Sequence, residues 1–147
     1  MAGGAGAARE TILHGSCVAH RGRALLITGA AGRGKSQLAL AMMALGAALV
    51  ADDRTLIRVE AGRLVADCPP AIAGLIEMRG LGLLRAEPAG PAPLAAVLDL
   101  DRAEPARLPP PRQMRLLGQS VPLLWRPNAS DLAPGLMQFL GFGRQAP

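Results

Sequence analysis

The stretch Ala24-Leu25-Leu26-Ile27-Thr28-Gly29-Ala30-Ala31-Gly32-Arg33-Gly34-Lys35-Ser36 decides the fold of this chain. Its first five residues are a short apolar run ending at a glycine, which predicts a buried strand. Its last eight residues read G-x-x-x-x-G-K-S, the pattern of the phosphate-binding loop of nucleotide triphosphatases. Residues 35–45 carry apolar side chains at helical spacing and stop at Gly46, which predicts a helix with a glycine end. The motif requires strand, loop and helix in this order, so we expect an α/β fold with a nucleotide site.

Lys35 is the only lysine among the sixteen Lys and Arg residues of the chain. A compact ammonium fits inside a tight backbone loop, where a forked guanidinium does not. Lys35 would neutralise the β- and γ-phosphates, and the Ser36 hydroxyl would bind Mg²⁺. The alternative is a chance glycine-rich turn, which the complete motif in its proper context disfavours. The residues expected to bind the nucleotide are Gly29, Ala30, Ala31, Gly32, Arg33, Gly34, Lys35 and Ser36.

Asp52 and Asp53 end a second apolar run, residues 47–51. An acid that follows a buried strand commonly holds Mg²⁺ in nucleotide sites. Strands of a parallel sheet end on the same edge, so we expect this pair beside the loop. Two carboxylates suggest two tasks, orienting the metal and taking a proton from an attacking hydroxyl. On the residues alone, a solvated turn or a cap stays open as the alternative.

Three further polar residues are candidates. His14 lies in a mostly apolar run, residues 11–19, which predicts a strand with a turn, and a lone histidine of this kind is more often structural. Glu77 and Arg79 lie in Leu75-Ile76-Glu77-Met78-Arg79-Gly80-Leu81-Gly82, between an apolar run and two glycines. Such a segment can present a carboxylate to a metal and its backbone to phosphate. The alternative is a surface turn with an internal ion pair.

The rest of the chain indicates one domain, residues 11–143, with a flexible start at 1–10 and a tail at 144–147. The expected elements are a hairpin at 55–60 and 63–67, a helix or strand at 71–78, a buried strand at 94–100, an extended loop at 108–112, one or two strands at 114–124, and a helix to Leu140 capped by Ser130 or Asp131.

The composition narrows the function classes. The net charge of +5 permits contact with phosphates or an acidic partner, but the arginines are scattered without interleaved aromatics, so we expect no nucleic-acid surface. The two cysteines, Cys17 and Cys68, have no metal-ligand spacing, and two buried thiols in a reducing compartment are expected. We expect neither a signal peptide nor a membrane-spanning helix, and a cytoplasmic protein.

Together these residues resemble the catalytic domain of HPr kinase/phosphorylase. The matching segments, in matching order and spacing, are His14-Gly15, residues 27–36, residues 49–53 and residues 75–82. The similarity covers about residues 12–85 and extends more weakly to about residue 128. Longer family members carry an additional N-terminal domain, so this chain looks like the short form with the catalytic domain only.

The resemblance implies an α/β fold of the P-loop kinase type, related to the nucleotide-binding core of phosphoenolpyruvate carboxykinase. It implies an ATP-dependent protein serine kinase that uses Mg²⁺ and acts on HPr, the phosphocarrier of the sugar phosphotransferase system. Many members also remove the seryl phosphate with inorganic phosphate, releasing pyrophosphate. Members are often hexameric, so a homo-oligomer is implied.

The resemblance also implies roles for single residues. Asp53 would be the base that takes the serine proton, and Asp52 would support it or the metal. Ser36 and Glu77 would hold Mg²⁺, and His14 would lie near the transferring phosphoryl group. Arg107, in Arg107-Leu108-Pro109, is similar to the arginine of a family Arg-Leu-Gly segment that stabilises the transferring phosphate.

The chain departs most from the family in the segment used for the reverse reaction. Members read roughly Pro-Val-x-x-Gly-Arg-Asn, whereas this chain reads Pro122-Leu123-Leu124-Trp125-Arg126-Pro127-Asn128. Kinase activity is therefore expected, and the reverse reaction stays open. Two other functions stay open: an ATP-sensing regulatory module with little turnover, in the phosphotransferase or a sensor-kinase pathway, and a small-molecule kinase.

Overall fold

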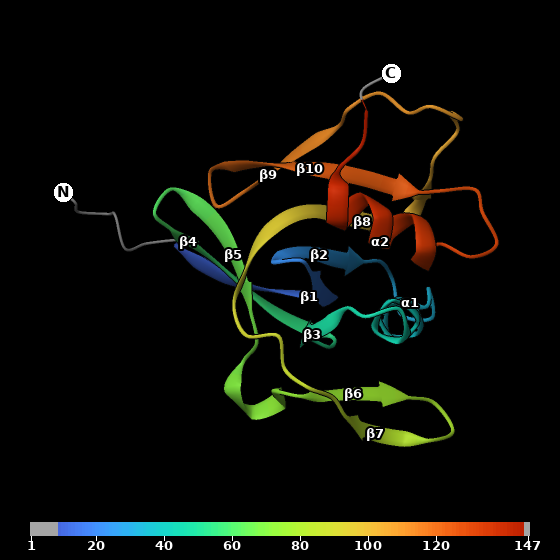
Figure 1. Ribbon diagram of the computed structural model, residues 1–147. Helices are drawn as coiled ribbons and strands as arrows, with labels where there is room; N and C mark the ends of the chain where they lie inside the picture. Colours follow the sequence, from blue (N-terminus) through green and yellow to red (C-terminus); the bar gives the residue numbers. More distant parts are fainter. Residues whose placement is uncertain (1–8, 146–147) are drawn as a thin grey trace.

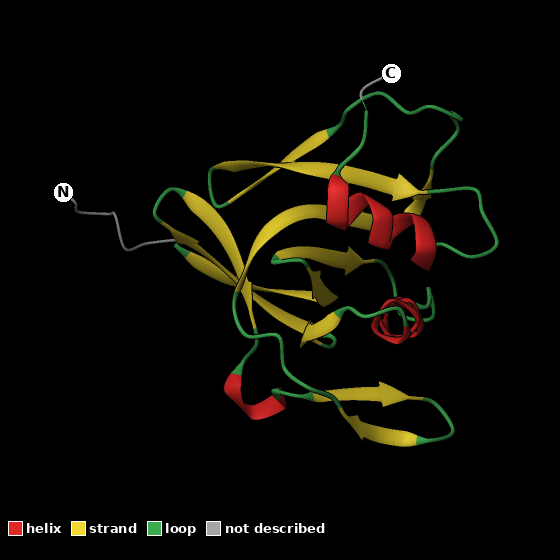
Figure 2. Cartoon of the chain, viewed as in Figure 1, coloured by secondary structure: helices red, strands yellow, loops and turns green. Residues whose placement is uncertain are grey.

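The computed structural model describes residues 9–145 as ten strands, two α-helices and one short 3-10 helix (Figures 1 and 2). The strands are β1 (Glu10–His20), β2 (Arg23–Thr28), β3 (Ala48–Ala51), β4 (Arg54–Glu60), β5 (Arg63–Asp67), β6 (Leu75–Met78), β7 (Gly82–Arg85), β8 (Ala92–Ala103), β9 (Gln113–Leu116) and β10 (Gln119–Arg126). The helices are α1 (Lys35–Ala44), η2 (Pro70–Ile72) and α2 (Ala133–Phe142).

Eight strands form one mixed sheet, which corrects the expectation of a parallel one. β1 is antiparallel to β2, β3 and β4, whereas β2 is parallel to β8, and β8 is parallel to β10. Because β2 and β3 both run antiparallel to β1, their carboxyl ends still lie on the same edge. The loop after β2 and the acids after β3 therefore meet as expected.

The two long strands change partners along their length. In β1, residues 10–14 pair with β4, and residues 15–20 pair with β2. In β8, residues 92–93 pair with β5, and residues 94–99 pair with β2. The predicted turn at His14-Gly15 is therefore wrong: the backbone stays extended there, and what changes at that point is the neighbouring strand.

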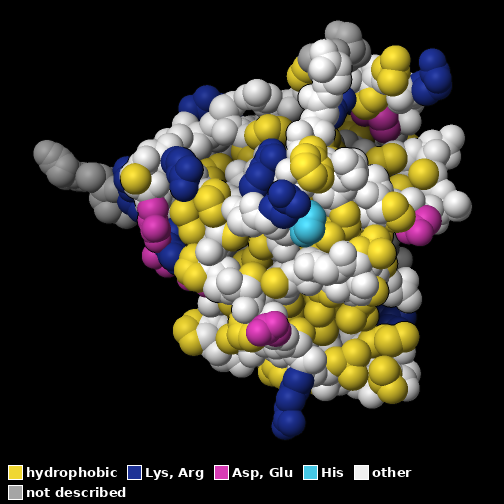
Figure 3. All heavy atoms as spheres, viewed as in Figure 1, with side chains coloured by type: hydrophobic (Ala, Val, Ile, Leu, Met, Phe, Trp, Pro, Cys, Tyr) yellow, Lys and Arg dark blue, Asp and Glu magenta, His cyan; other side chains and the backbone are white. Residues whose placement is uncertain are grey.

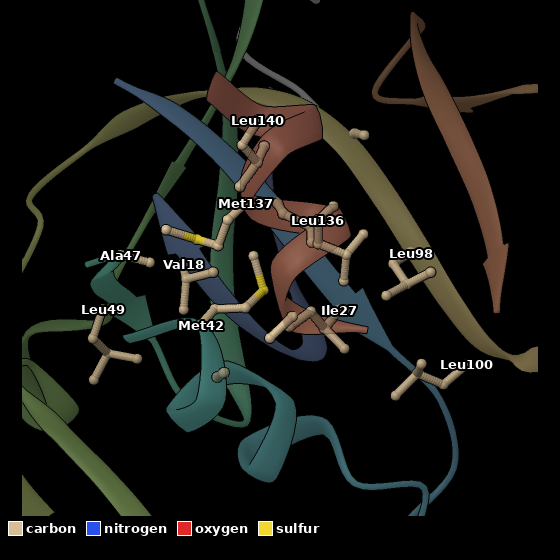
Figure 4. Close-up of a cluster of buried hydrophobic side chains, with 14 of the residues drawn as sticks. Val18, Ile27, Met42, Ala47, Leu49, Leu98, Leu100, Leu136, Met137 and Leu140 are labelled. Atoms are coloured by element: carbon tan, nitrogen blue, oxygen red, sulfur yellow. The ribbon is translucent and has the colours of Figure 1, made fainter. Parts of the chain in front are cut away.

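The core lies on both faces of the central strands, since successive side chains of a strand point to opposite faces. Leu25 and Ile27 belong to the cluster under the helices, whereas Leu26 belongs to the cluster on the other face, and all three are fully buried. The first cluster is closed by α1 and α2, which contribute Met42 and Leu140 (Figure 4). This two-sided burial explains why residues 24–28 read as a continuous apolar run.

Most predicted elements are found, with differences at their ends. The predicted hairpin is β4–β5, and residues 71–78 contain both a helical turn, η2, and a strand, β6. The strand β7 was not predicted. The last helix begins at Ala133 with Leu132 at its N-cap and no side-chain cap bond, although Asp131 Oδ1 accepts a hydrogen bond from the Ala133 N–H at 3.3 Å.

The two ends of the chain extend outside the described residues. Of the expected flexible start, residues 1–8 are not described, and Glu10 already belongs to β1. Of the expected tail, residues 146–147 are not described, and Arg144 Nη1 donates a hydrogen bond to the Pro109 carbonyl at 2.9 Å. None of the helices described between residues 9 and 145 has the length and apolar character needed to span a membrane.

Candidate functional site

The glycine-rich loop, residues 29–34, joins the carboxyl end of β2 to the amino end of α1. Gly34, at the N-cap of α1, has φ 90°, a left-handed conformation that favours glycine. Lys35 turns back over the loop: its Nζ donates hydrogen bonds to the carbonyls of Gly29 at 2.7 Å and Ala30 at 3.3 Å. The residue is only 8% exposed, so the one ammonium of the chain is held inside the curve of the loop.

Asp52 connects three separate segments of the chain. Its Oδ1 accepts hydrogen bonds from the Ser16 hydroxyl at 2.8 Å and from the Ser36 hydroxyl at 2.6 Å. Its Oδ2 accepts the Glu77 N–H at 3.0 Å. Asp52 is 8% exposed, and a buried carboxylate needs such donors because desolvation of a charge is costly. Asp52 therefore ties β1, the start of α1 and β6 together beneath the loop.

Asp53 is a different kind of carboxylate. Its side chain is 62% exposed, and its Oδ1 lies 2.7 Å from His14 Nε2, on a ring that is 60% exposed. Its backbone has φ 67°, an unusual conformation for a residue other than glycine. The Asp53 carbonyl accepts the Gly15 N–H at 2.9 Å, which fixes the bend between β3 and β4 against β1. The bend points Asp52 inward and leaves Asp53 at the surface.

Gly15 allows this arrangement because it lies directly against β2. A Cβ at this position would be 2.6 Å from the Ile27 carbonyl oxygen, well inside van der Waals contact. Its neighbours His14 and Ser16 contact Asp53 and Asp52, respectively. One three-residue segment of β1 therefore positions both carboxylates.

A cavity of about 300 Å³ brings most of the predicted residues together. The predicted site residues in its wall are His14, Ala31, Gly32, Gly34, Lys35, Ser36, Asp53 and Glu77. The hairpin β6–β7, which lies apart from the main sheet in Figure 2, brings Glu77 to the cavity together with Met78 and Arg79. Asp52 is not in the wall of the cavity, but it accepts a hydrogen bond from Ser36, which is. Residues from four distant parts of the sequence thus share one pocket.

Arg107 lies elsewhere. It lines a second cavity, of about 490 Å³, whose wall comes from parts of the segments 104–112 and 123–128 and from Arg144. There the Trp125 ring lies between two guanidinium groups, those of Arg102 at 4.3 Å and Arg112 at 3.7 Å from its centre. Arg112 also forms an ion pair with Glu104. The segment expected to serve the reverse reaction, 122–128, contributes Leu123, Leu124, Trp125, Pro127 and Asn128 to the wall of this second cavity. Arg126 is not in that wall, and its Nε donates a hydrogen bond to the Leu100 carbonyl at 3.0 Å.

Within residues 9–145, three loop residues of the predicted set, Gly29, Ala30 and Arg33, are absent from the wall of the first cavity. The Ala30 N–H donates to both carboxylate oxygens of Asp101, at 3.1 Å each. Arg33 Nε donates to Asp101 Oδ1 at 2.9 Å.

Sequence reasoning missed Ser16 and Asp101. No motif in the sequence includes Ser16, and a single serine in a mostly apolar strand does not by itself indicate a site. Asp101 had a signal in the sequence, because Asp99 and Asp101 follow the apolar residues 94–98, much as Asp52 and Asp53 follow 47–51. The parallel pairing of β2 with β8, which matches Thr28 with Asp99, brings the end of that run beside the loop.

The oxygen atoms around the cavity suit Mg²⁺, which takes one or two protein oxygens together with substrate phosphates and water. The Ser36 hydroxyl donates its hydrogen bond to Asp52, which leaves the lone pairs of the Ser36 oxygen for a metal. Asp53 and Glu77 add carboxylates to the same wall. No group of three or more His, Cys, Asp and Glu side chains forms a metal cluster within the described part of the chain.

Comparison with known proteins gives concordant matches. The family model of the HPr Serine kinase C-terminal domain matches residues 6–89. The HPr kinase/phosphorylase of Bordetella petrii is 44% identical over 78 residues, which are 52% of this chain and 25% of that protein. That of Clostridium tetani is 44% identical over 77 residues, again 52% and 25%. These matches therefore span about a quarter of the length of the curated relatives.

A solved structure is similar over nearly the whole chain. The Hpr(Ser) kinase/phosphatase from Coxiella burnetii superimposes with a TM-score of 0.77 and 26% sequence identity. The superposition covers 89% of this chain and 88% of that one. The mixed α/β fold described above is thus the fold of that structure.

Proposed function

This chain belongs to the HPr Serine kinase C-terminal domain family, and on that premise we propose that it is an ATP-dependent protein serine kinase acting on HPr. The observation that carries the proposal is the shared cavity, where the loop with Lys35, the His14–Asp53 pair and Glu77 line one wall. A phosphate-binding element, a base and a metal-binding carboxylate are the parts that phosphoryl transfer to a hydroxyl requires.

In this proposal the glycine-rich loop is a P-loop, and the fold is related to the nucleotide-binding core of phosphoenolpyruvate carboxykinase. The N–H groups at the start of α1 point at the phosphates, and the helix adds its positive end. Lys35 now donates to the Gly29 and Ala30 carbonyls. On binding ATP it moves its ammonium to the β- and γ-phosphates, which are stronger acceptors.

Asp53 is the base of the transfer. The serine hydroxyl oxygen attacks the γ-phosphorus, the bond to the β,γ-bridging oxygen breaks, and ADP leaves. The serine proton passes to Asp53 Oδ2, because His14 engages Oδ1 at 2.7 Å and holds the carboxylate in place. The exposure of Asp53 suits this role, since a protein substrate must bring its serine to it.

Ser36 and Glu77 would hold Mg²⁺, with Asp52 orienting Ser36 through the bond to its hydroxyl. When bound, the metal neutralises charge on the β- and γ-phosphate oxygens. Asp52 also fixes the backbone of Glu77. One buried carboxylate thus positions both candidate metal ligands, and phosphoryl transfer depends on such positioning.

Phosphorylation of purified HPr tests the proposal. The protein is incubated with HPr, ATP and Mg²⁺, and phosphate on HPr serine is measured by mass spectrometry. We expect one seryl phosphate per HPr, a strong loss in Lys35→Ala, and little change in the exposed-acid control Glu87→Gln. ATP binding by calorimetry without any phosphate on HPr would contradict the kinase proposal.

That outcome would favour a second function, an ATP-sensing module with little turnover. One observation supports it: Arg107, expected to stabilise the transferring phosphate, lines the other cavity. The reverse reaction is tested separately, by phosphate-dependent release of pyrophosphate from seryl-phosphorylated HPr. Sedimentation of the purified protein tests the homo-oligomer that the resemblance implies.

A further inference from the structure

Asp101 lies outside the proposed machinery, yet it makes three contacts with the glycine-rich loop. It is near the carboxyl end of β8, two residues beyond Asp99, the register partner of Thr28. Both of its carboxylate oxygens accept the Ala30 N–H at 3.1 Å, and Oδ1 accepts Arg33 Nε at 2.9 Å. Its own N–H donates to Asp99 Oδ1 at 2.9 Å, so the acid is itself held in place.

The carboxylate approaches the loop from outside the cavity. Of the residues described, those in the wall of the 300 Å³ cavity include the opposite side of the loop, Ala31, Gly32 and Gly34, but not Asp101. A carboxylate bound to the N–H groups of the loop that face the cavity would compete with a phosphate for those groups. On the outer side it leaves the inner N–H groups available while restraining the peptide it binds.

The restrained peptide is the one that holds the lysine. Ala30 gives its N–H to Asp101, and its carbonyl accepts Lys35 Nζ at 3.3 Å and the Arg33 N–H at 3.1 Å. The Gly29 carbonyl, the other acceptor of Lys35 at 2.7 Å, belongs to the same peptide unit as the Ala30 N–H that Asp101 binds, whereas the Ala30 carbonyl belongs to the next one. Gly29 also lies against β8, since a Cβ there would be 3.2 Å from Leu100 Cβ. The start of the loop is therefore fixed from the β8 side.

We propose that Asp101 is a positioning residue for nucleotide binding: by holding the Ala30 peptide from outside, it keeps the loop and Lys35 in the conformation that receives the phosphates. The inference rests on the proposed function, because it assumes that this loop binds ATP. Pre-ordering of a loop lowers the free-energy cost of binding and leaves the chemical step alone. Loss of this pre-ordering should therefore raise the KM for ATP and leave kcat nearly unchanged.

The bond to the Ala30 N–H contributes more than the ion pair. The Arg33 and Asp101 side chains are 49% and 42% exposed, and exposed pairs contribute little. An asparagine keeps an acceptor for the Ala30 N–H and loses only the charge. Asp101→Asn should therefore rescue most of what Asp101→Ala loses.

The test compares four variants in full-length protein. In Asp101→Ala we expect the Kd and KM for ATP with Mg²⁺ to rise about ten-fold, with kcat within about two-fold of wild type. Asp101→Asn and Arg33→Ala should raise both by about two- to three-fold or less. Asp131→Ala is the matched control: this aspartate also accepts a backbone N–H, that of Ala133, but does not line the cavity. It should lower the unfolding temperature without changing KM.

The outcomes separate the two proposals. Wild-type protein that fails to bind ATP overturns the proposed function and this inference together. Normal binding by wild type with an unchanged KM in Asp101→Ala overturns the inference alone. An equal loss in Asp101→Asn and Asp101→Ala also overturns it, because the charge and not the backbone contact would then be responsible. If Asp101→Ala does not fold, Asp101→Asn and Arg33→Ala still decide, because a rise in KM well above about three-fold in either of them overturns the inference.

Discussion

Asp52 and Asp53 are neighbours in the sequence with opposite surroundings. Asp52 is buried and accepts three hydrogen bonds, from Ser16, Ser36 and the Glu77 backbone. Asp53 is 62% exposed and contacts a histidine that is almost equally exposed. The first carboxylate links segments that are far apart in the chain, whereas the second faces solvent where a partner can reach it.

The difference shows how one bend can place one carboxylate in the interior and its neighbour at the surface. A buried acceptor with several donors is costly to remove, because each donor loses its partner. An exposed carboxylate contributes little to stability and is available for proton transfer. The positive φ of Asp53 produces this separation, since it turns the backbone between the two side chains. Four measurements test the comparison, from the largest expected effect to the smallest.

Replacing Asp53 tests the chemical half of the comparison. In Asp53→Asn we expect HPr phosphorylation to fall about a thousand-fold, because an amide cannot take the serine proton. ATP affinity should stay near the wild-type value, and the free energy of unfolding should change by less than about 0.5 kcal/mol. Phosphate on HPr is followed by mass spectrometry, with calorimetry for ATP. Transfer at the wild-type rate would remove Asp53 from the role of base.

Replacing Asp52 tests the structural half. Asp52→Ala should lower the free energy of unfolding by about 3 kcal/mol, since Ser16, Ser36 and the Glu77 N–H lose their common acceptor. Urea unfolding measures the change, and Asp53→Asn is the control, because asparagine tolerates the positive φ of this position; its expected change is below about 0.5 kcal/mol. Equal effects of the two substitutions would show that the buried carboxylate does not link the segments as described.

Gly15 tests whether the segment that positions both acids depends on close packing. Gly15→Ala should destabilise the protein by about 1–3 kcal/mol, because the added Cβ meets the Ile27 carbonyl at 2.6 Å. Gly135→Ala in α2 is the control, since a Cβ there meets nothing within 4 Å, and alanine favours a helix. Thermal and urea unfolding of both variants check this. A Gly15→Ala protein as stable as wild type would mean that β1 and β2 separate easily.

The two cysteines report how tightly the region beside Asp52 is closed. Burial raises the pKa of the Cys17 thiol, next to Ser16, so its reactive thiolate is scarce at neutral pH. Burial and the nearby Asp67 carboxylate also raise the pKa of Cys68, which is only half-buried. With a thiol reagent we expect one slow reaction, at Cys68, faster at higher pH, and a second thiol only after unfolding. Rapid labelling of Cys17 in native protein would show that this part of the core opens.

The surface of the protein agrees with the charge pattern of the sequence. On the face shown in Figure 3, Lys and Arg side chains are dispersed among hydrophobic ones and do not form one basic stripe. Several apolar residues outside the core are also exposed, among them Leu81 and Leu83 of the hairpin. The hairpin therefore leaves part of its apolar surface exposed, although its sequence is rich in Leu, Ile and Met.

Local patterns predicted much of the fold because they depend on neighbours in the chain. The structure forms β2 from the run 24–28, followed by the glycine-rich loop and α1, as the motif predicts. It also forms the β4–β5 hairpin predicted from residues 55–60 and 63–67. β7 was missed because three of its four residues, Leu83, Leu84 and Arg85, lie beyond Gly82, where the glycine-bounded motif ends. The turn predicted at His14-Gly15 is absent for another reason: pairing with β2 and β4 keeps β1 extended through Gly15.

The sequence by itself determined the nucleotide motif, the acids after β3 and the family. It also indicated the candidate residues His14, Lys35, Asp53 and Glu77, because each belongs to a short pattern that can be recognised from neighbouring residues alone. Only the tertiary structure decided which acid is buried and which is exposed, that Ser16 and Asp101 contact the site, and that Arg107 lines another cavity. These facts depend on strand pairing between distant segments, such as β2 with β8, and on a single backbone bend at Asp53. No local pattern encodes them, because the side chains concerned meet only after the sheet has formed.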